Sequence, residues 1–173
     1  PGDTIITTGI ASQGVEKLGK KVVRTRVGSP FVVGKMKEVG ARFGFAPNGG
    51  AISAEIMYTR DGGSMTMKIL NLFLKFNGKF SEMIGELPKF YMFRTKVDYE
   101  WGLKDKIISG AKNHFSGIKI DETDGLKIWI DETTWVLFRS SANASELRVF
   151  AESSEEQKAK NLLEDGINFV NEI

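Results

Sequence analysis

The residues with the clearest capacity for chemistry lie in one short segment, FRSSANASELRVFAES, at positions 138–153. Six small residues, S-S-A-N-A-S, separate two apolar runs, and Arg139 and Arg148 flank them. Small side chains let ligand oxygens reach backbone N–H groups, while hydroxyls, an amide and two guanidinium groups supply donors that match phosphate. Two or three charge-assisted hydrogen bonds of about 1.5–3 kcal/mol each suffice for millimolar affinity. The segment predicts a weak phosphate site, and a solvated hairpin loop with surface arginines stays open as the alternative.

The composition excludes several classes of site. The chain has 173 residues, 41% of them hydrophobic, which is enough for one or two globular domains. Zero cysteines exclude disulfides and thiolate catalysis, and the single histidine, His114, excludes most His-cluster metal sites. The net charge of +2, with dispersed lysines, favours neither nucleic acid nor a membrane as a partner. No 18-residue apolar run and no charged-then-apolar leader occur, so we expect no membrane span, no signal peptide and a cytoplasmic location.

The first half of the chain alternates strand and helix patterns. Short β-branched runs at 4–9 and 21–25 are separated by a helical segment around 12–20. Such a β-α-β-α order favours a parallel sheet with helices on its faces. Two further strands are expected at 41–45 and 51–57. Two helices are expected, one from Pro30 to a stop at Gly40 with Val33, Met36 and Val39 on one side, and one capped by Asp61 with a stripe of Met65, Ile69, Leu72 and Phe73.

The pattern changes near Leu87, where we place a domain boundary that divides the chain into 1–87 and 88–173. A strand at 90–97 and a helix at 101–115 precede four short strand segments joined by turn residues, which predicts an antiparallel meander. A last helix is expected to open at Ser153 and Ser154, with Glu156 and Gln157 completing a capping box. The predicted fold class is an α/β first domain with a mixed sheet and helices on both faces, followed by an α+β domain whose antiparallel sheet is packed by helices.

The segment R-S-S-A-N-A-S-E-L-R-V-F-A-E-S resembles the phosphate-binding loop of the α-D-phosphohexomutases, whose usual pattern is R-P-S-G-T-E-P-x-x-R-V-Y-x-E-A. This family includes the phosphoglucomutases and phosphomannomutases. Residues 22–52 are similar to its third domain, where T-x-V-G, a K-M-K-E-x-G-A helix and a sugar-recognition loop follow one another. Residues 60–70, RDGGSMTMKIL, resemble the helix that comes next. The similarity covers nearly the whole chain.

The resemblance implies part of a four-domain enzyme that moves a phosphoryl group between positions 1 and 6 of a hexose phosphate, through a phosphoserine and a reoriented bisphosphate. The fourth domain grips the phosphate that does not react, and the third reads the sugar hydroxyls. By match, phosphate would be bound by Arg139, Ser141, Ala142 (through its backbone), Asn143 and Arg148, and the sugar by Arg26, Asn48, Gly49 and Gly50.

Several residues depart from the family pattern. The glutamate that takes two sugar hydroxyls falls at Ala46, so sugar recognition would be weakened or rearranged. Asn143, in place of threonine, can still donate a hydrogen bond. The catalytic serine and the magnesium loop D-G-D-x-D-R do not occur, so no catalytic or metal-binding residue is assigned. The acidic run D-E-T-D-G at 121–125 is interpreted as a solvated hairpin turn rather than a metal loop.

These departures predict that the chain is the C-terminal, substrate-binding part of a longer phosphohexomutase. Its implied partners are a phosphorylated hexose and the N-terminal domains, with Mg²⁺ bound by those domains and hexose 1,6-bisphosphate as activator or intermediate. Two other function classes are weighed. Ala46 motivates a non-catalytic sugar-phosphate-binding module or a decayed paralogue. The aromatic strand with Phe90, Tyr91 and Phe93 motivates a nucleic-acid module, which lacks an RNP-like pattern and a basic face.

Overall fold

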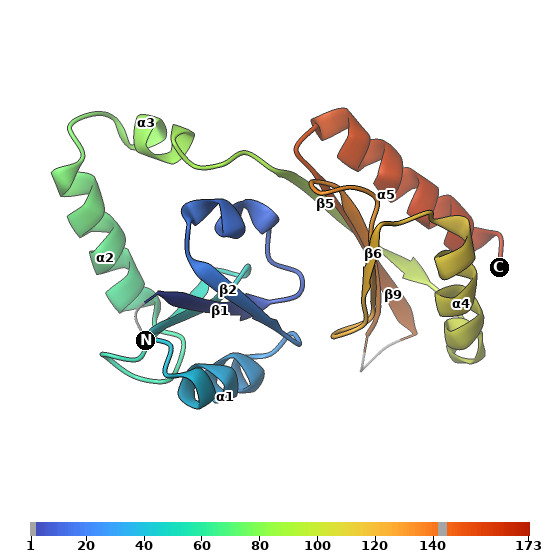
Figure 1. The fold of residues 1–173 in the computed structure, drawn as a ribbon, viewed down its shortest axis with the longest axis horizontal. Helices are drawn as coiled ribbons and strands as arrows, with labels where there is room; N and C mark the ends of the chain where they lie inside the picture. The colour runs from blue at the N-terminus through green and yellow to red at the C-terminus, as the bar shows by residue number, and fades with distance from the viewer. Residues whose placement is uncertain (1–2, 142–144) are drawn as a thin grey trace. The chain divides into compact units, whose positions relative to one another are not determined.

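The computed structural model describes residues 3–141 and 145–173, and the chain divides into two units, Pro1–Lys89 (unit 1) and Phe90–Ile173 (unit 2). The division lies close to the boundary expected near Leu87. Unit 1 is an α/β unit with a mixed sheet and helices, and unit 2 is an α+β unit with an antiparallel sheet and helices (Figure 1). The predicted fold class is therefore confirmed.

The sheet of unit 1 has four strands in the order β2-β1-β3-β4. Strand β1 (Thr4–Thr8) pairs in parallel with β2 (Lys21–Thr25) on one side and β3 (Phe43–Ala46) on the other. Strand β4 (Gly50–Ser53) returns antiparallel to β3. Because three strands run in the same direction, their carboxyl ends meet at one edge of the sheet, where α/β folds place their ligands.

One face of this sheet is covered by α1 (Ser29–Val39), and η1 (Gln13–Leu18), a 3-10 helix, lies on the other side (Figure 1). Gly40 ends α1 in the left-handed conformation, as predicted. The buried α1 residues are Val32 and Met36, which pack on Ile6 and Ile52 of the sheet. Val39 was expected on the packed side of the helix, but it is 41% exposed.

Helix α2 (Gly62–Lys75) begins as predicted, because the Asp61 carboxylate accepts hydrogen bonds from the amides of Gly63 and Ser64 at 3.0 and 3.3 Å. The expected packing stripe, however, buries no α2 residue. Leu72 and Leu74 are 63% and 81% exposed. A short helix α3 (Phe80–Gly85) follows. Unit 1 thus leaves the apolar side chains of α2 largely in contact with solvent.

Unit 2 contains a five-stranded antiparallel sheet in the order β5-β9-β8-β7-β6. Strands β6 (Lys119–Asp121), β7 (Leu126–Trp129), β8 (Trp135–Ser140) and β9 (Glu146–Ser153) form the predicted meander, and β5 (Tyr91–Asp98) pairs with β9 at the edge. The unit's helical elements are η2 (Trp101–Leu103), α4 (Lys104–His114) and α5 (Glu156–Asn171).

Helices α4 and α5 lie on one face of this sheet (Figure 1). The core between them includes Phe138 from β8, Val149 from β9, Ile107 from α4 and Phe169 from α5. Because side chains alternate along a strand, the residues next to Phe138 and Val149 point to the opposite face. That alternation places the two arginines of the candidate phosphate site away from the helices.

The predicted capping box at the start of α5 is wrong. Ser153 belongs to β9, where it pairs with Tyr91, so the helix begins later, with Glu155 as its N-cap and no capping hydrogen bond from that side chain. The Ser153 hydroxyl instead accepts a hydrogen bond from the Glu155 amide at 3.2 Å. The strand pairing therefore overrides the local capping signal.

Asp131, in the turn between β7 and β8, joins this turn to α5. One carboxylate oxygen accepts from the Nζ of Lys158 at 2.6 Å, and the other accepts from the Thr133 amide at 2.7 Å. Burial by itself raises the pKa of Asp131, but the hydrogen bonds from Lys158 and Thr133 outweigh it and hold the pKa well below its usual range.

Replacing Asp131 with asparagine is expected to lower the free energy of unfolding at pH 7 by at most about 1 kcal/mol, because the ion pair is exposed. Because the folded-state pKa of Asp131 is lowered, its carboxylate stabilises the fold fully above the unfolded-state pKa of about 3.9. This stabilisation is lost as the pH falls from that value towards the folded-state pKa. Urea unfolding of both proteins at pH 7 and at lower pH tests this. A difference that stays constant below about pH 4 would contradict the role of the carboxylate.

Candidate functional site

The two arginines of the S-S-A-N-A-S segment face each other across neighbouring strands. Arg139 in β8 and Arg148 in β9 are directly opposed in the antiparallel register. Directly opposed side chains share a face of the sheet, and here it is the face opposite α4 and α5. Like charges in this arrangement repel each other. Two guanidinium groups side by side therefore form a local site that attracts an anion.

Arg139 is held by a carboxylate that the sequence reasoning did not identify. Its Nε donates to Oδ2 of Asp124 at 2.8 Å, and the two side chains are 17% and 11% exposed. Asp124 belongs to the D-E-T-D-G turn between β6 and β7. The interpretation of this run as a hairpin turn agrees with the structure, but the Asp124 side chain is not solvated as that interpretation implied. A short acidic turn gives no signal of such a pairing in the sequence.

Arg148 is also a partly buried side chain. Its Nε is buried and has no hydrogen-bond partner among residues 3–141 and 145–173. On its other side, Arg148 is opposed by Lys96 of β5, whose Nζ contacts Glu146 at 2.9 Å. The guanidinium of Arg148 also carries terminal amino groups, which are further donors of the kind that bind phosphate.

The loop between the two arginines is described only at its ends. The amide of Ser141 donates to the carbonyl of Glu146 at 2.8 Å, so this N–H is used by the strand pair. Any contribution of Ser141 to a ligand must come from its hydroxyl, and the residue is 7% exposed. The predicted phosphate contacts of Ala142 and Asn143 lie outside the described residues.

The predicted sugar-binding residues share one edge of the sheet in unit 1. Arg26 directly follows β2, and Asn48 and Gly49 form the turn that follows β3 and leads to Gly50. Since β2 and β3 flank β1 in parallel, both segments leave the sheet at its carboxyl edge, about 10 Å apart. Arg26 is exposed and lies 5.6 Å from the centre of the Phe31 ring.

The same edge is stiffened by Arg24, which the sequence reasoning did not single out. Its guanidinium donates to the carbonyls of Thr8 and Ala11 at 3.1 and 2.7 Å and pairs with Glu16. These bonds tie β2 to the segment that leaves β1. Arg24 therefore links the end of β2 to the backbone between the two predicted sugar-binding segments.

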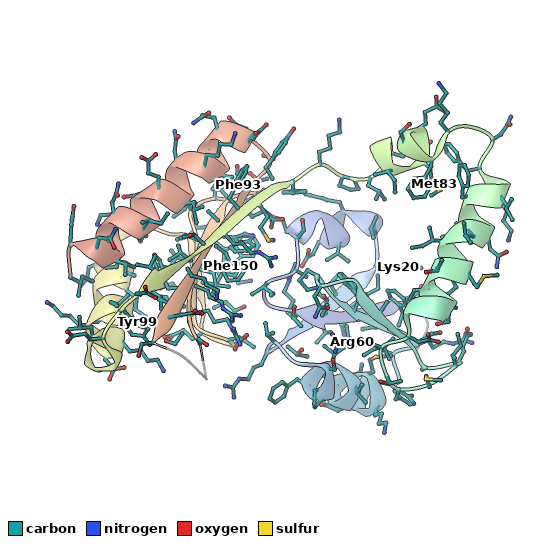
Figure 2. All side chains as sticks on the ribbon, turned by 180° about the vertical axis from the view of Figure 1, so that it is seen from behind. Lys20, Arg60, Met83, Phe93, Tyr99 and Phe150 are labelled. Atoms are coloured by element: carbon teal, nitrogen blue, oxygen red, sulfur yellow. The ribbon has the colours of Figure 1, made fainter. Side chains whose placement is uncertain are left out.

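Arg60 was also missed, and it lies beside the turn (Figure 2). A Cβ at Gly50 would be 2.9 Å from the Arg60 Cγ, so the stem of Arg60 packs over this glycine. Gly49 has a φ of +80°, which favours glycine. The two glycines together allow a tight turn with a guanidinium close by. Ala46, in place of the family's glutamate, is the last residue of β3 and is half-buried.

Neither a metal cluster nor a membrane helix is found in the described parts of the chain. No group of three or more His, Cys, Asp or Glu residues that could hold a metal ion occurs within residues 3–141 and 145–173. The described helices are also too short or too polar to cross a membrane. The family resemblance implies that Mg²⁺ is bound by other domains of a longer protein.

Comparisons with known proteins identify the family and the fold. The family model "Phosphoglucomutase/phosphomannomutase, alpha/beta/alpha domain III" matches residues 2–91. A phosphoglucomutase/phosphomannomutase from Thermococcus kodakarensis is 39% identical over 170 residues, which are 98% of this chain and 37% of that protein. The chain thus spans a little over a third of this relative's length.

Solved structures show the same fold. A phosphoglucomutase/phosphomannomutase family protein from Burkholderia thailandensis superposes with a TM-score of 0.81 at 20% identity, over 99% of this chain and 38% of that one. The Aspergillus fumigatus N-acetylphosphoglucosamine mutase, solved with GlcNAc-6P and magnesium, gives a TM-score of 0.65 at 14% identity, over 97% and 41%. The family model covers more than half of the residues, and this match shows that the chain belongs to the phosphoglucomutase/phosphomannomutase family.

Proposed function

We propose that this chain is the substrate-binding part of a phosphohexomutase that interconverts hexose 1-phosphate and hexose 6-phosphate. The observation that carries the proposal is the opposed pair of Arg139 and Arg148 on β8 and β9, which places two guanidinium groups at the two ends of a small-residue loop. Planar guanidinium groups bind phosphate through paired hydrogen bonds. Membership of the phosphoglucomutase/phosphomannomutase family supports a phosphorylated hexose as the ligand.

In this proposal the chain binds and orients the substrate, and other parts of a longer protein carry out the phosphoryl transfer. Arg139, Arg148, the Ser141 hydroxyl and residues 142–143 hold the phosphate that does not react. Arg26 and the Asn48–Gly50 turn contact the sugar hydroxyls. Binding that fixes the orientation of a substrate contributes to catalysis by lowering the entropy lost in the chemical step.

The finer parts of the proposal concern the parent protein. A phosphoserine, Mg²⁺ and a hexose 1,6-bisphosphate intermediate would belong to its other domains, and we expect it to act in the cytoplasm. The relative lengths support further domains, because the chain spans 37% of the Thermococcus kodakarensis protein. The Aspergillus fumigatus structure, solved with GlcNAc-6P and magnesium, supports the use of both a sugar phosphate and Mg²⁺ in this family.

Replacing Arg139 with alanine is expected to weaken binding of glucose 1-phosphate or mannose 1-phosphate by about 10–100-fold, because one or two charge-assisted hydrogen bonds are lost. Isothermal titration with the purified chain measures this. The matched control is Arg42→Ala, which removes an exposed guanidinium paired with Glu55 just before β3. Equal affinity of Arg139→Ala and the unsubstituted chain would refute the phosphate assignment.

A second candidate function is favoured by Ala46. Without a carboxylate at the end of β3, the site has lost a group that accepts two hydrogen bonds from sugar hydroxyls, so the parent protein could bind a sugar phosphate without converting it. An assay of the longer protein for mutase activity separates the two functions. Turnover would support the enzyme, and binding without turnover, with serine and magnesium motifs intact, would support the non-catalytic module.

A further inference from the structure

The D-E-T-D-G turn between β6 and β7 has a feature that a plain hairpin turn does not need. Its Asp124 carboxylate accepts a hydrogen bond from the guanidinium of Arg139, which lies on β8. Both side chains are less than one-fifth exposed. A surface pair such as Lys20 with Asp3, by contrast, has side chains that are 47% and 88% exposed. The Asp124–Arg139 contact is therefore largely shielded from water, where a hydrogen bond between charged groups is directional and strong.

The backbone of the turn is shaped so that Asp124 reaches this position. Asp121 accepts a hydrogen bond from the Thr123 amide at 2.9 Å, which closes the first part of the turn. Burial raises the pKa of Asp121, but the hydrogen bonds from Thr123 and the nearby lysines outweigh it, and the pKa lies below its usual value. Gly125 then adopts a φ of +100° directly against β8, with its hypothetical Cβ 3.1 Å from the Cα of Arg139.

Arg139 needs such a partner because its neighbour across the strands is Arg148. Two like charges in directly opposed positions repel each other, and a long arginine side chain loses rotamer entropy when it is held in one direction. Asp124 bonds Arg139 through Nε. Besides Nε, the guanidinium carries two terminal amino groups, whose shared end-on edge can bind phosphate through paired hydrogen bonds.

From this geometry we propose that Asp124 is a positioning residue for phosphate binding, which holds the Arg139 guanidinium in the direction that a phosphate requires. The inference rests on the proposed function, since it needs Arg139 to bind phosphate. Two explanations predict opposite changes in phosphate affinity when the Asp124 carboxylate is removed. Asp124 carries a negative charge close to the site, so simple electrostatics expects tighter phosphate binding when the carboxylate is removed. Positioning expects weaker binding.

The test is isothermal titration of the chain with glucose 1-phosphate and, separately, with inorganic phosphate, which probes the phosphate site without the sugar. Asp124→Ala is expected to weaken both affinities by about tenfold, within the range of coupling between residues in contact. Asp124→Asn is expected to lose less, about threefold, because its amide oxygen still accepts from Nε. A general structural defect would not make the loss of affinity smaller for the variant that keeps a hydrogen-bond acceptor at residue 124.

The matched control is Asp131→Ala, which removes an ion-paired carboxylate from the neighbouring β7–β8 turn. It is expected to leave both affinities unchanged. If Asp124→Ala does not fold, as judged by its circular dichroism and thermal unfolding, Asp124→Asn decides the question. The inference is overturned if the folded Asp124 variants bind as tightly as the unsubstituted chain, or more tightly. If Arg139→Ala also leaves binding unchanged, the proposed function fails as well, whereas a loss with Arg139→Ala alone refutes only the role of Asp124.

Discussion

Replacing Phe138 with alanine is expected to lower the free energy of unfolding of unit 2 by about 3–5 kcal/mol. The Phe138 ring is fully buried, and its centre lies 5.5 and 5.9 Å from those of Phe115 and Phe169. Alanine would leave a cavity where β8 meets α4 and α5, and it would also remove the contacts of two aromatic pairs. Because Phe138 directly precedes Arg139, the loss should also loosen the strand that carries the candidate site.

The measurement is chemical denaturation followed by circular dichroism, with hydrogen exchange of the β8 and β9 amides to assign the transition to unit 2. For a domain of this size, the unfolding temperature should fall by more than about 10 °C. Leu74→Ala is the control. It also truncates an apolar side chain, but one that is 81% exposed, and it should change stability by no more than about 0.5 kcal/mol. A loss below about 1 kcal/mol for Phe138→Ala would contradict its place in the core.

Replacing Gly125 with alanine is expected to destabilise unit 2 by about 2–5 kcal/mol, for two reasons that add. Its φ of +100° lies in a region that L-residues rarely adopt. The added Cβ would also collide with the carbonyl oxygen of Phe138 and lie 3.1 Å from the Cα of Arg139. These are backbone atoms of a central strand, so the turn must move, and Asp124 must move away from Arg139 with it.

Gly19→Ala separates the two reasons. Gly19 also has a positive φ, +69°, but nothing lies within 4 Å of a Cβ built there. It should cost only the backbone strain, about 1–2 kcal/mol. The comparison is made by urea unfolding of both variants and by titration with inorganic phosphate, which Gly125→Ala should weaken and Gly19→Ala should not. Equal destabilisation by the two substitutions would mean that the turn relaxes away from β8 without cost.

The sequence was sufficient for the fold because local and long-range signals agree there. The β-branched runs, the glycine stop after α1 and the Asp61 cap each act over a few residues, and the sheets formed as their order predicted. The start of α5 was misplaced because two signals competed. Ser153 has the chemistry of a helix cap, but its pairing with Tyr91 in the sheet is a contact over many residues that no local pattern contains.

The candidate site could be predicted only in part. Arg139 and Arg148 were identified because they flank a loop of small residues, and their opposition across β8 and β9 follows from the short connection. The partner of Arg139 could not be found in this way. Asp124 is 15 residues away along the chain, and only the register of β7 on β8 brings its turn to the arginine. Arg60 could not be predicted for the same reason. Its side chain packs over Gly50 only because the chain folds back after β4.

Helix α2 presents much of its apolar surface to water, with Met67, Leu72 and Leu74 each more than half exposed. Large uncovered apolar patches promote association between molecules. When the 173-residue chain is prepared by itself, copies should therefore cluster as the protein is concentrated. Hydrophobic attraction weakens on cooling, so cold, dilute preparations should keep the molecules apart, and warming should bring turbidity before any loss of secondary structure.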